Sequence, residues 1–208
     1  MQRLSEIVDE IIQSPRFKQL DNLIENNSYH EHESVYAHSL SVYKRALEAV
    51  QGDFISNTEA KKLYLSFLNE ELYGYKRSEL LCLIALLHDI GKGEAGVLVT
   101  DEDGNTKAPG HELAGSTIVD QFIDQQDFSP EAIKYLTNCI RLHNTMGNYF
   151  DKPVPGDILQ IVNEIKQEGE GYFIENLFNI YCDALEADVF ADSLLKIVQV
   201  FNQPELYD

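Results

Sequence analysis

Residues 84–93 read IALLHDIGKG, where an apolar run ends in a histidine, an aspartate and a glycine-rich turn. Every residue of 80–87 is apolar, which predicts a helix with nearly all of its faces buried. His88 and Asp89 continue that helix and are therefore expected to be buried. A buried imidazole needs a partner, and a buried carboxylate without a cation is costly. A divalent metal ion would satisfy both, because imidazole and carboxylate are ligands of Zn, Fe and Mn.

Three more histidines lie in settings that suit a metal ligand. His38 shares a predicted helical stripe with Val35 and other apolar residues. His111 immediately precedes a predicted helix in the segment GHELAGS, and His143 ends one in the segment LHNTMG. A lone histidine on an apolar face is usually satisfied by a neighbour in the core. Several such histidines in one chain favour a shared metal site instead.

A second carboxylate ligand is predicted in the segment IYCDALEAD, which covers 180–188. Asp183 lies on the apolar stripe of a predicted helix, and its immediate neighbours are small and apolar. Asp188 can be interpreted in the same way, so the choice between the two aspartates stays open. The sequence favours Asp183.

The chain is predicted to be all-α, because apolar residues recur three and four apart almost throughout. The predicted helical segments are 3–13, 16–26, 34–50, 58–73, 78–90, 112–126, 130–143, 157–167, 171–190 and 192–201. Ser34, Thr58, Ser78 and Ser129 are the predicted N-caps, with Pro130 at a first helical position. The segment 97–108 breaks this pattern and predicts a small hairpin or structured loop that could form a lip over a site. We expect one compact helical bundle that spans 1–208 as a single domain.

Composition limits the partners and the location of the protein. The 208 residues include 35 acidic and 16 basic ones, for a formal charge of −19. Such a surface repels long nucleic acids, whose binding depends on neutralised phosphates, but it leaves room for a small anion in a local pocket. Cys82, Cys139 and Cys182 are widely spaced, as is typical of a reducing compartment. The N-terminus lacks a signal pattern and no apolar run approaches about 20 residues, so we expect a cytoplasmic protein without a membrane span.

In these motifs the sequence resembles the HD-domain superfamily of metal-dependent phosphohydrolases. HSLSVYKRA resembles the first ligand helix of that family, ALLHDIGKG its central His-Asp motif, and DALEAD its last ligand helix. GHELAGS and LHNTMG are similar to segments of the branch that binds a second metal, as in HD-type hydrolases of diadenosine tetraphosphate. They also resemble segments of HD domains fused to bacterial tRNA nucleotidyltransferases. The resemblance covers about 34–190.

The resemblance implies a metal-dependent phosphohydrolase or phosphodiesterase that acts on a nucleotide or another small phosphate ester. It implies one or two divalent ions per chain, and Fe, Mn, Co, Ni, Zn and Mg are all compatible with such ligands. Asp89 would bridge the two ions, and a water activated between them would attack the phosphorus. The ligands that it implies are His38, His88, Asp89 and Asp183 for the first ion, with His111 and His143 added for the second.

Asp89, His111 and Lys92 are the residues that we expect to take part in catalysis. Lys92 lies three residues after Asp89 in a Gly-x-Gly turn, and we expect it to contact the substrate phosphate. The alternative for Lys92 is an ordinary cation at the C-terminus of a helix. His30 and His32 precede the first ligand helix and could reach the site mouth, but a solvated loop is the favoured interpretation.

Other residues near these motifs are weaker candidates for the site. Arg141 is expected to be a surface residue, although it could clamp a phosphate. Asn144 and Thr145 could line the pocket.

Three other functions compete with hydrolysis. The main alternative is a non-catalytic HD module that senses a nucleotide, although a full ligand set is not needed for sensing. A structural bundle with buried histidines and a di-iron oxygenase are the others. The sequence leaves the exact substrate, the metal identity, the occupancy of the second site and the oligomeric state undetermined.

Overall fold

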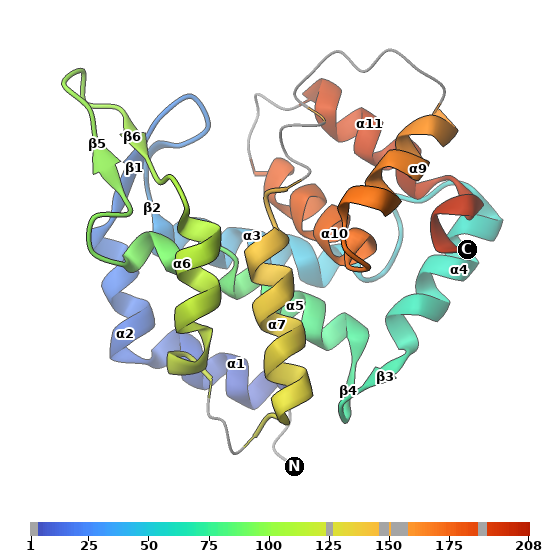
Figure 1. Cartoon of the computed structure of the whole chain (residues 1–208), viewed down its shortest axis with the longest axis horizontal. Helices are drawn as coiled ribbons and strands as arrows, with labels where there is room; N and C mark the ends of the chain where they lie inside the picture. Colours follow the sequence, from blue (N-terminus) through green and yellow to red (C-terminus); the bar gives the residue numbers. More distant parts are fainter. Residues whose placement is uncertain (1–3, 124–126, 146–149, 151–157, 187–190) are drawn as a thin grey trace.

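A computed structural model describes residues 4–123, 127–145, 150, 158–186 and 191–208 of the chain. The predicted all-α class is confirmed, because helices dominate and the strands are short (Figure 1). The α-helices are α1 (Leu4–Gln13), α2 (Pro15–Lys18), α3 (Val35–Ala49), α4 (Thr58–Asn69), α5 (Arg77–Leu87), α6 (His111–Ile118), α7 (Pro130–Leu142), α9 (Ile158–Glu168), α10 (Phe173–Ala184) and α11 (Ala191–Phe201). The 3₁₀ helices are η1 (Gln19–Asn22), η2 (Ile90–Gly93), η3 (Val119–Gln121) and η5 (Pro204–Tyr207).

Three antiparallel hairpins occur in the described part of the chain. Their strands are β1 (Ile24–Asn26), β2 (Glu31–Ser34), β3 (Glu71–Leu72), β4 (Tyr75–Lys76), β5 (Val99–Thr100) and β6 (Thr106–Lys107). The β5–β6 hairpin confirms the prediction for 97–108. It lies against the β1–β2 hairpin, where Asn26 N donates a hydrogen bond of 2.8 Å to Thr106 Oγ1. The two hairpins therefore form one rim beside α6 (Figure 1).

Several predicted helices were too long: those over 112–126 and 171–190 end as α-helices at Ile118 and Ala184, and two others extend over strands. The helix over 16–26 is wrong after Asn22, because 24–26 pairs with 31–34 as β1–β2. The helix over 58–73 ends at Asn69, and the chain then turns through β3–β4. Both errors arise because the spacing of apolar residues along the chain does not show which segments pair as strands.

The helix starts depend on local capping. Ser34 Oγ accepts from Ala37 N at 3.1 Å, and Ser129 Oγ accepts from Ala132 N at 3.2 Å, so these two predicted caps are confirmed. The other two predicted caps are wrong. Asn57, not Thr58, caps α4 through its side-chain oxygen. Helix α5 begins before Ser78, where the Glu79 carboxylate accepts from Lys76 N at 2.9 Å.

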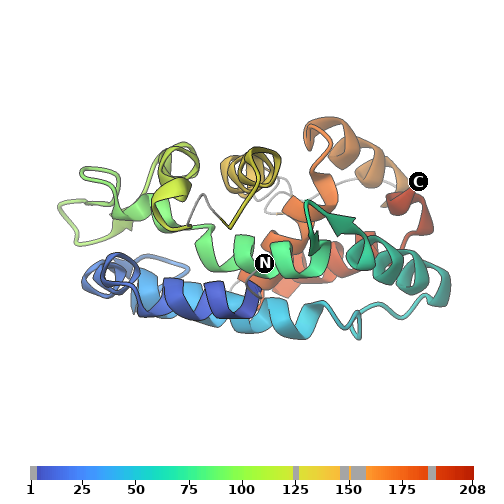
Figure 2. The same ribbon diagram turned by 90° about the horizontal axis from the view of Figure 1, so that it is seen from below.

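Helix α5 is the central element of the fold. All residues of 80–87 are buried, as the sequence predicts. Figure 2 shows α5 between a layer that contains α1 and α3 and a layer that contains α6 and α7. Helix α10 packs against both α3 and α5. The carboxyl end of α5 therefore delivers His88 and Asp89 to the middle of the molecule.

A close approach between η2 and α6 brings the next segment beside that end. A Cβ atom added at Gly91 would lie 2.0 Å from the backbone oxygen of His111 and 2.3 Å from Gly115 N. Only glycine fits at 91, because both neighbouring atoms belong to the backbone of α6. This contact sets the distance between Asp89 and the first residue of α6.

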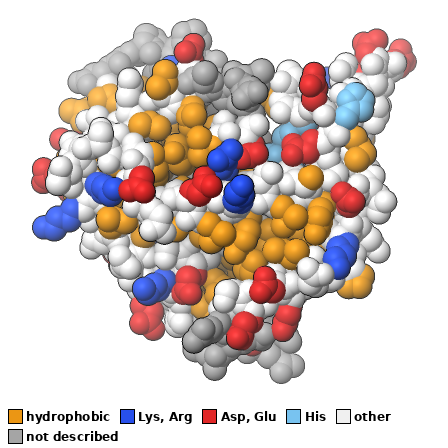
Figure 3. Space-filling view, turned by 180° about the vertical axis from the view of Figure 1, so that it is seen from behind, with side chains coloured by type: hydrophobic (Ala, Val, Ile, Leu, Met, Phe, Trp, Pro, Cys, Tyr) orange, Lys and Arg blue, Asp and Glu red, His pale blue; other side chains and the backbone are white. Residues whose placement is uncertain are grey.

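The surface carries both signs of charge in a dispersed pattern. Figure 3 shows apolar side chains gathered on the far face, with acidic and basic side chains scattered among them. Cys82, Cys139 and Cys182 are free and buried. In the described ranges, no helix has both the length and the apolar character that a bilayer crossing requires.

Candidate metal centre

Asp89 is the residue around which the candidate centre is arranged. It follows His88, the C-cap of α5, and only 2 % of its surface is exposed. Its Oδ2 atom lies 3.1 Å from His88 Nε2 and 3.6 Å from His38 Nε2. Its Oδ1 atom lies 3.1 Å from His111 Nε2 and 3.8 Å from His143 Nε2. The two oxygens of one buried carboxylate therefore face two different pairs of histidines.

These side chains form two groups of potential metal donors that share Asp89. In each group, one donor atom per residue lies within 4.8 Å of the others. The groups are His38, His88, Asp89 and Asp89, His111, His143. Helices α3, α5, α6 and α7 supply or adjoin these residues, so segments far apart in the sequence meet here as predicted.

Asp183 joins the first group from α10. Its Oδ1 atom lies 3.1 Å from His38 Nε2, and its side chain is 43 % exposed. Asp188, the alternative that the sequence left open, lies outside the described residues. The geometry thus brings Asp183 to the cluster and makes it the carboxylate that opens toward solvent.

Three of the histidines have their Nδ1 atoms held by backbone. Nδ1 lies 2.8 Å from Ala85 O in His88, 2.7 Å from Ala108 O in His111 and 2.7 Å from Ile140 O in His143. A carbonyl oxygen can only accept, so each Nδ1 carries a proton and Nε2 is the nitrogen that each ring can offer to a metal ion. Those Nε2 atoms are the ones that face Asp89.

The charges of the cluster suit metal ligands. Burial raises the pKa of Asp89, but the attraction of His88 and Lys92 outweighs it and holds that pKa well below the usual range. Burial also opposes ionisation of Asp183, but hydrogen bonding and attraction from His38 lower its pKa. Burial and repulsion from His88 lower the pKa of His143 to about 4. Both carboxylates are therefore ionised and His143 is neutral near pH 7.

The pKa values of His38 and His111 are raised, in contrast to that of His143. Burial by itself lowers the pKa of His38, but its contacts with Asp183 and Glu33 raise that pKa to about 10. Burial likewise opposes protonation of His111, and its contact with Asp89 raises the pKa overall. The surrounding carboxylates attract positive charge to these two rings, and a bound cation would meet the same attraction.

Two arrangements of imidazole nitrogens at the centre are unfavourable without a bound cation and would become favourable with one. His111 Nε2 and His143 Nε2 lie 3.2 Å apart, although both Nδ1 atoms already carry protons. Two lone pairs at that distance repel unless a positive charge lies between or beside them. His88 Nε2 is buried and has no hydrogen-bond partner among the described residues. Imidazole nitrogens and carboxylate oxygens in this arrangement suit a first-row divalent ion.

Lys92 lies beneath the cluster in a contact that the sequence did not indicate. Its Nζ atom lies 2.7 Å from Asp89 Oδ2 and 2.8 Å from Glu25 Oε2. Both Lys92 and Glu25 are buried, so Lys92 is not an ordinary surface cation at a helix end. Glu25 was missed because nothing around it in β1 distinguishes it from the other acidic residues of the chain.

The segment before α3 also reaches the site. His32 is exposed, as expected, but the prediction of a solvated loop is wrong for His30. His30 Nδ1 lies 3.2 Å from Glu33 Oε2, and its ring packs edge-on against the His38 ring with centroids 4.5 Å apart. Sequence reasoning missed Glu33, whose neighbours in EHES are charged or polar. Arg141 pairs with Glu170 at the surface, as expected.

A cavity of about 780 Å³ opens above the candidate centre. His38, Asp89, His111, His143 and Asp183 all line it. The β5–β6 hairpin and 27–30 contribute polar residues to its rim, so the hairpin borders the site as the sequence suggested. The rest of the wall includes Asn144 and the apolar side chains of Ile180 and Ile197. The volume lies within the usual range for small-molecule sites.

Comparison with known proteins agrees with this geometry. The family model for the HD domain matches residues 35–165, which is more than half of the chain. No curated protein matches the chain. The matched region contains the His-Asp pair and three of the other histidines at the centre, and the helical fold is the one that the resemblance implied. The chain belongs to the HD domain family.

Proposed function

We propose that this protein is a metal-dependent phosphohydrolase that acts on a nucleotide or another small phosphate ester. The observation that supports this function best is the position of Asp89. Its two carboxylate oxygens face two groups of histidines at the floor of a cavity of about 780 Å³. The HD domain family generally consists of metal-dependent hydrolases, so membership favours the same reaction class.

The first ion would be held by His38, His88, Asp89 and Asp183, and the second by Asp89, His111 and His143. Divalent ions supply a Lewis acid for the phosphoryl oxygens and a water that ionises near neutral pH. Mixed imidazole and carboxylate ligation is compatible with Mn, Fe, Co, Ni, Zn or Mg.

The remaining walls suggest how a substrate would be oriented. Lys92 and Lys107 are the cationic residues among the described part of the lining, and they lie near the floor and on the β5–β6 rim. A phosphate held between them would lie close to Asp89. Ile180 and Ile197 offer an apolar wall that suits the non-phosphate part of a small ester. The formal charge of −19 opposes long polyanions and favours a compact substrate.

Metal content and turnover test this function together. The protein would be stripped with a chelator, reloaded separately with Mn²⁺, Fe²⁺ or Co²⁺, and assayed for bound metal by elemental analysis. Each form would then be tested for phosphate release from a panel of nucleotides, phosphodiesters and phosphomonoesters. We expect bound metal and hydrolysis of at least one class of ester.

A matched pair of variants separates the competing functions. Asp89→Asn removes the shared ligand charge, whereas Asp103→Asn removes an exposed aspartate from the β5–β6 turn. Hydrolysis predicts that only Asp89→Asn abolishes metal binding and turnover. Tight nucleotide binding without product under every metal would favour a sensing module instead. A wild-type protein that binds no metal would contradict both functions and leave a structural bundle.

A further inference from the structure

His38 differs from the other histidines of the candidate centre in how its second nitrogen is held. In His88, His111 and His143, Nδ1 lies within 2.8 Å of the carbonyl oxygen three residues earlier. His38 Nδ1 makes no such contact and has no partner within hydrogen-bond distance in the described part of the chain. The carboxylate that faces it is that of Glu33, whose Oε2 atom lies 3.6 Å away.

The position of each histidine in its helix explains the difference. His88 and His143 are the C-caps of α5 and α7, where the last carbonyl groups of a helix have no intrahelical partner. His111 is the first residue of α6, so Ala108 lies before the helix. His38 is the fourth residue of α3, where the carbonyl groups of the helix bond to amides one turn later. The carbonyl group three residues before His38, that of Val35, is therefore engaged within the helix and does not hold Nδ1.

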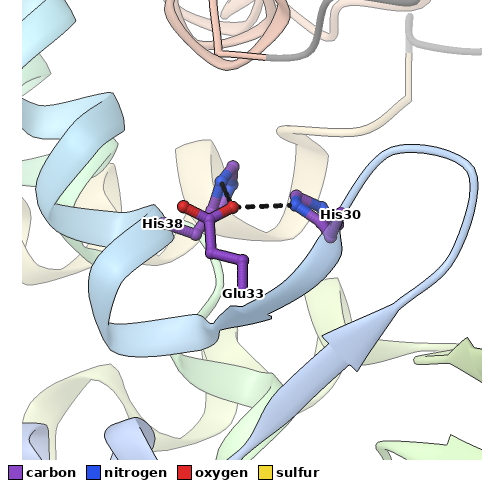
Figure 4. Close-up of side chains that lie close together, drawn as sticks. All are labelled: His30, Glu33 and His38. Atoms are coloured by element: carbon purple, nitrogen blue, oxygen red, sulfur yellow. Dashed lines mark hydrogen bonds and ion pairs between the residues drawn. The ribbon is translucent and has the colours of Figure 1, made fainter.

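Glu33 is the side chain that is placed for this purpose. It lies on β2, opposite Glu25 of β1, and its carboxylate projects toward the first turn of α3 (Figure 4). Its Oε2 atom also lies 3.2 Å from His30 Nδ1, as the dashed line in Figure 4 shows. A carboxylate can only accept hydrogen bonds, so Glu33 can hold a proton that a neighbouring imidazole nitrogen carries.

We propose that Glu33 is the positioning residue for His38. Its carboxylate accepts the Nδ1 proton, so that the lone pair of Nε2 points toward Asp89 and Asp183. The Glu33 side chain is 32 % exposed and has room to close the 3.6 Å gap, by about 0.7 Å, to an ordinary hydrogen-bond length. A carboxylate partner also makes an imidazole a stronger metal donor than a carbonyl partner does. This inference depends on the metal centre of the proposed function.

His30, Glu33 and His38 could instead hold an ion of their own, because their donor atoms lie within 4.8 Å of one another. That arrangement would use Nδ1 of His38. Nε2 of the same ring already faces Asp183 at 3.1 Å and Asp89 at 3.6 Å. A ring that binds ions through both nitrogens must lose both of its protons, which is unfavourable near neutral pH. The geometry therefore favours a positioning role for Glu33.

Titration of the metal-free full-length chain with Co²⁺, in competition with a chelator, tests the proposal. Glu33→Ala removes the acceptor, and Glu33→Gln keeps an acceptor but removes its charge. Glu31→Gln is the matched control, because Glu31 lies on the same strand and is exposed. We expect Co²⁺ affinity to fall by about 10- to 100-fold in Glu33→Ala and by less in Glu33→Gln. The visible spectrum of bound Co²⁺ should change in both, and the number of ions per chain should not.

Other results would overturn the proposal in distinguishable ways. Unchanged affinity and spectrum in both Glu33 variants, with normal Co²⁺ binding by the wild type, would refute the role of Glu33 alone. Loss of one ion per chain with the remaining affinity intact would assign Glu33 to a separate metal site. A wild type that binds no Co²⁺ would refute the proposed function and this role together. Melting curves of the metal-free proteins check folding, and if Glu33→Ala is unfolded the isosteric Glu33→Gln decides.

Discussion

The contact between Gly91 and helix α6 leads to a quantitative prediction for Gly91→Ala. The new Cβ atom would lie 2.0 Å from the backbone oxygen of His111, whereas ordinary contact begins at 3.4 Å. Helix α6 would have to retreat by about 1.4 Å, because neither backbone can rotate out of the way. Overpacking a core usually costs about 1–3 kcal/mol, and we expect about 3 kcal/mol here, since backbone atoms clash.

The same displacement should separate the two groups of ligands. The clashing oxygen belongs to His111, whose Nε2 atom lies 3.1 Å from Asp89 Oδ1. Movement of α6 would weaken the group that contains His111 and spare the group that contains His38. We therefore expect Gly91→Ala to bind one ion fewer per chain than the wild type, if the wild type binds two.

Gly93→Ala is the control for this substitution, since Gly93 ends the same 3₁₀ helix. Its added Cβ atom would meet Leu20 Cδ2 at 3.0 Å and Leu23 Cδ1 at 4.0 Å, and both are methyl groups of side chains that can move. We expect a loss of less than about 1 kcal/mol. Urea denaturation of the metal-free proteins gives the free energies of unfolding, and elemental analysis gives the metal content. Equal stability of the Gly91 and Gly93 variants would refute the reasoning.

Three further predictions concern charge and metal. Lys92→Met should lower the free energy of unfolding of the metal-free protein by about 3–5 kcal/mol in urea, since it removes the ammonium group that the buried carboxylates of Glu25 and Asp89 share, and adding Glu25→Gln should restore part of the loss. Burial raises the pKa of Glu175 in the folded protein above its ordinary value of 4.5. Glu175 therefore lowers the free energy of unfolding as the pH rises above about 4.5. Glu175→Gln should therefore melt above the wild type at pH 8, with a difference that shrinks toward pH 4, and a lower melting temperature at pH 8 would contradict this. Mn²⁺ at about 100 times its dissociation constant should stabilise the wild type by about 2.7 kcal/mol in the same denaturation assay and leave Asp89→Asn unchanged.

The parts of the fold that local rules control could be predicted from the sequence. Helices α3 and α7 begin where serine caps were expected, and α5 is buried because every residue of 80–87 is apolar. The helix expected over 16–26 was wrong because 24–26 pairs with 31–34, and apolar periodicity carries no information about such pairing. Local patterns therefore predicted elements better than they predicted contacts between elements.

The candidate ligands were predictable for a related physical reason. A histidine or aspartate on an apolar helix face is conspicuous, because burial without a partner is costly. Glu25 and Glu33 stand among polar and charged neighbours, where an acidic residue needs no explanation. Their proximity to the site arises from the β1–β2 hairpin, which turns them toward α3 and η2. Supporting carboxylates of this kind become visible only when the strands are paired in space.

The β1–β2 hairpin also shows that some charged groups around the candidate centre lie outside the part of the chain that the family model matches. The family match begins at residue 35 and ends at residue 165. Glu25 and Glu33 precede it, and Asp183 follows it. A polypeptide trimmed to the matched region would keep all four histidines around Asp89 but lose Glu33 and Asp183, which face His38, and Glu25, which pairs with Lys92. Such a polypeptide would still match the family model, but the buried cationic groups of the centre would lack some of their carboxylate partners.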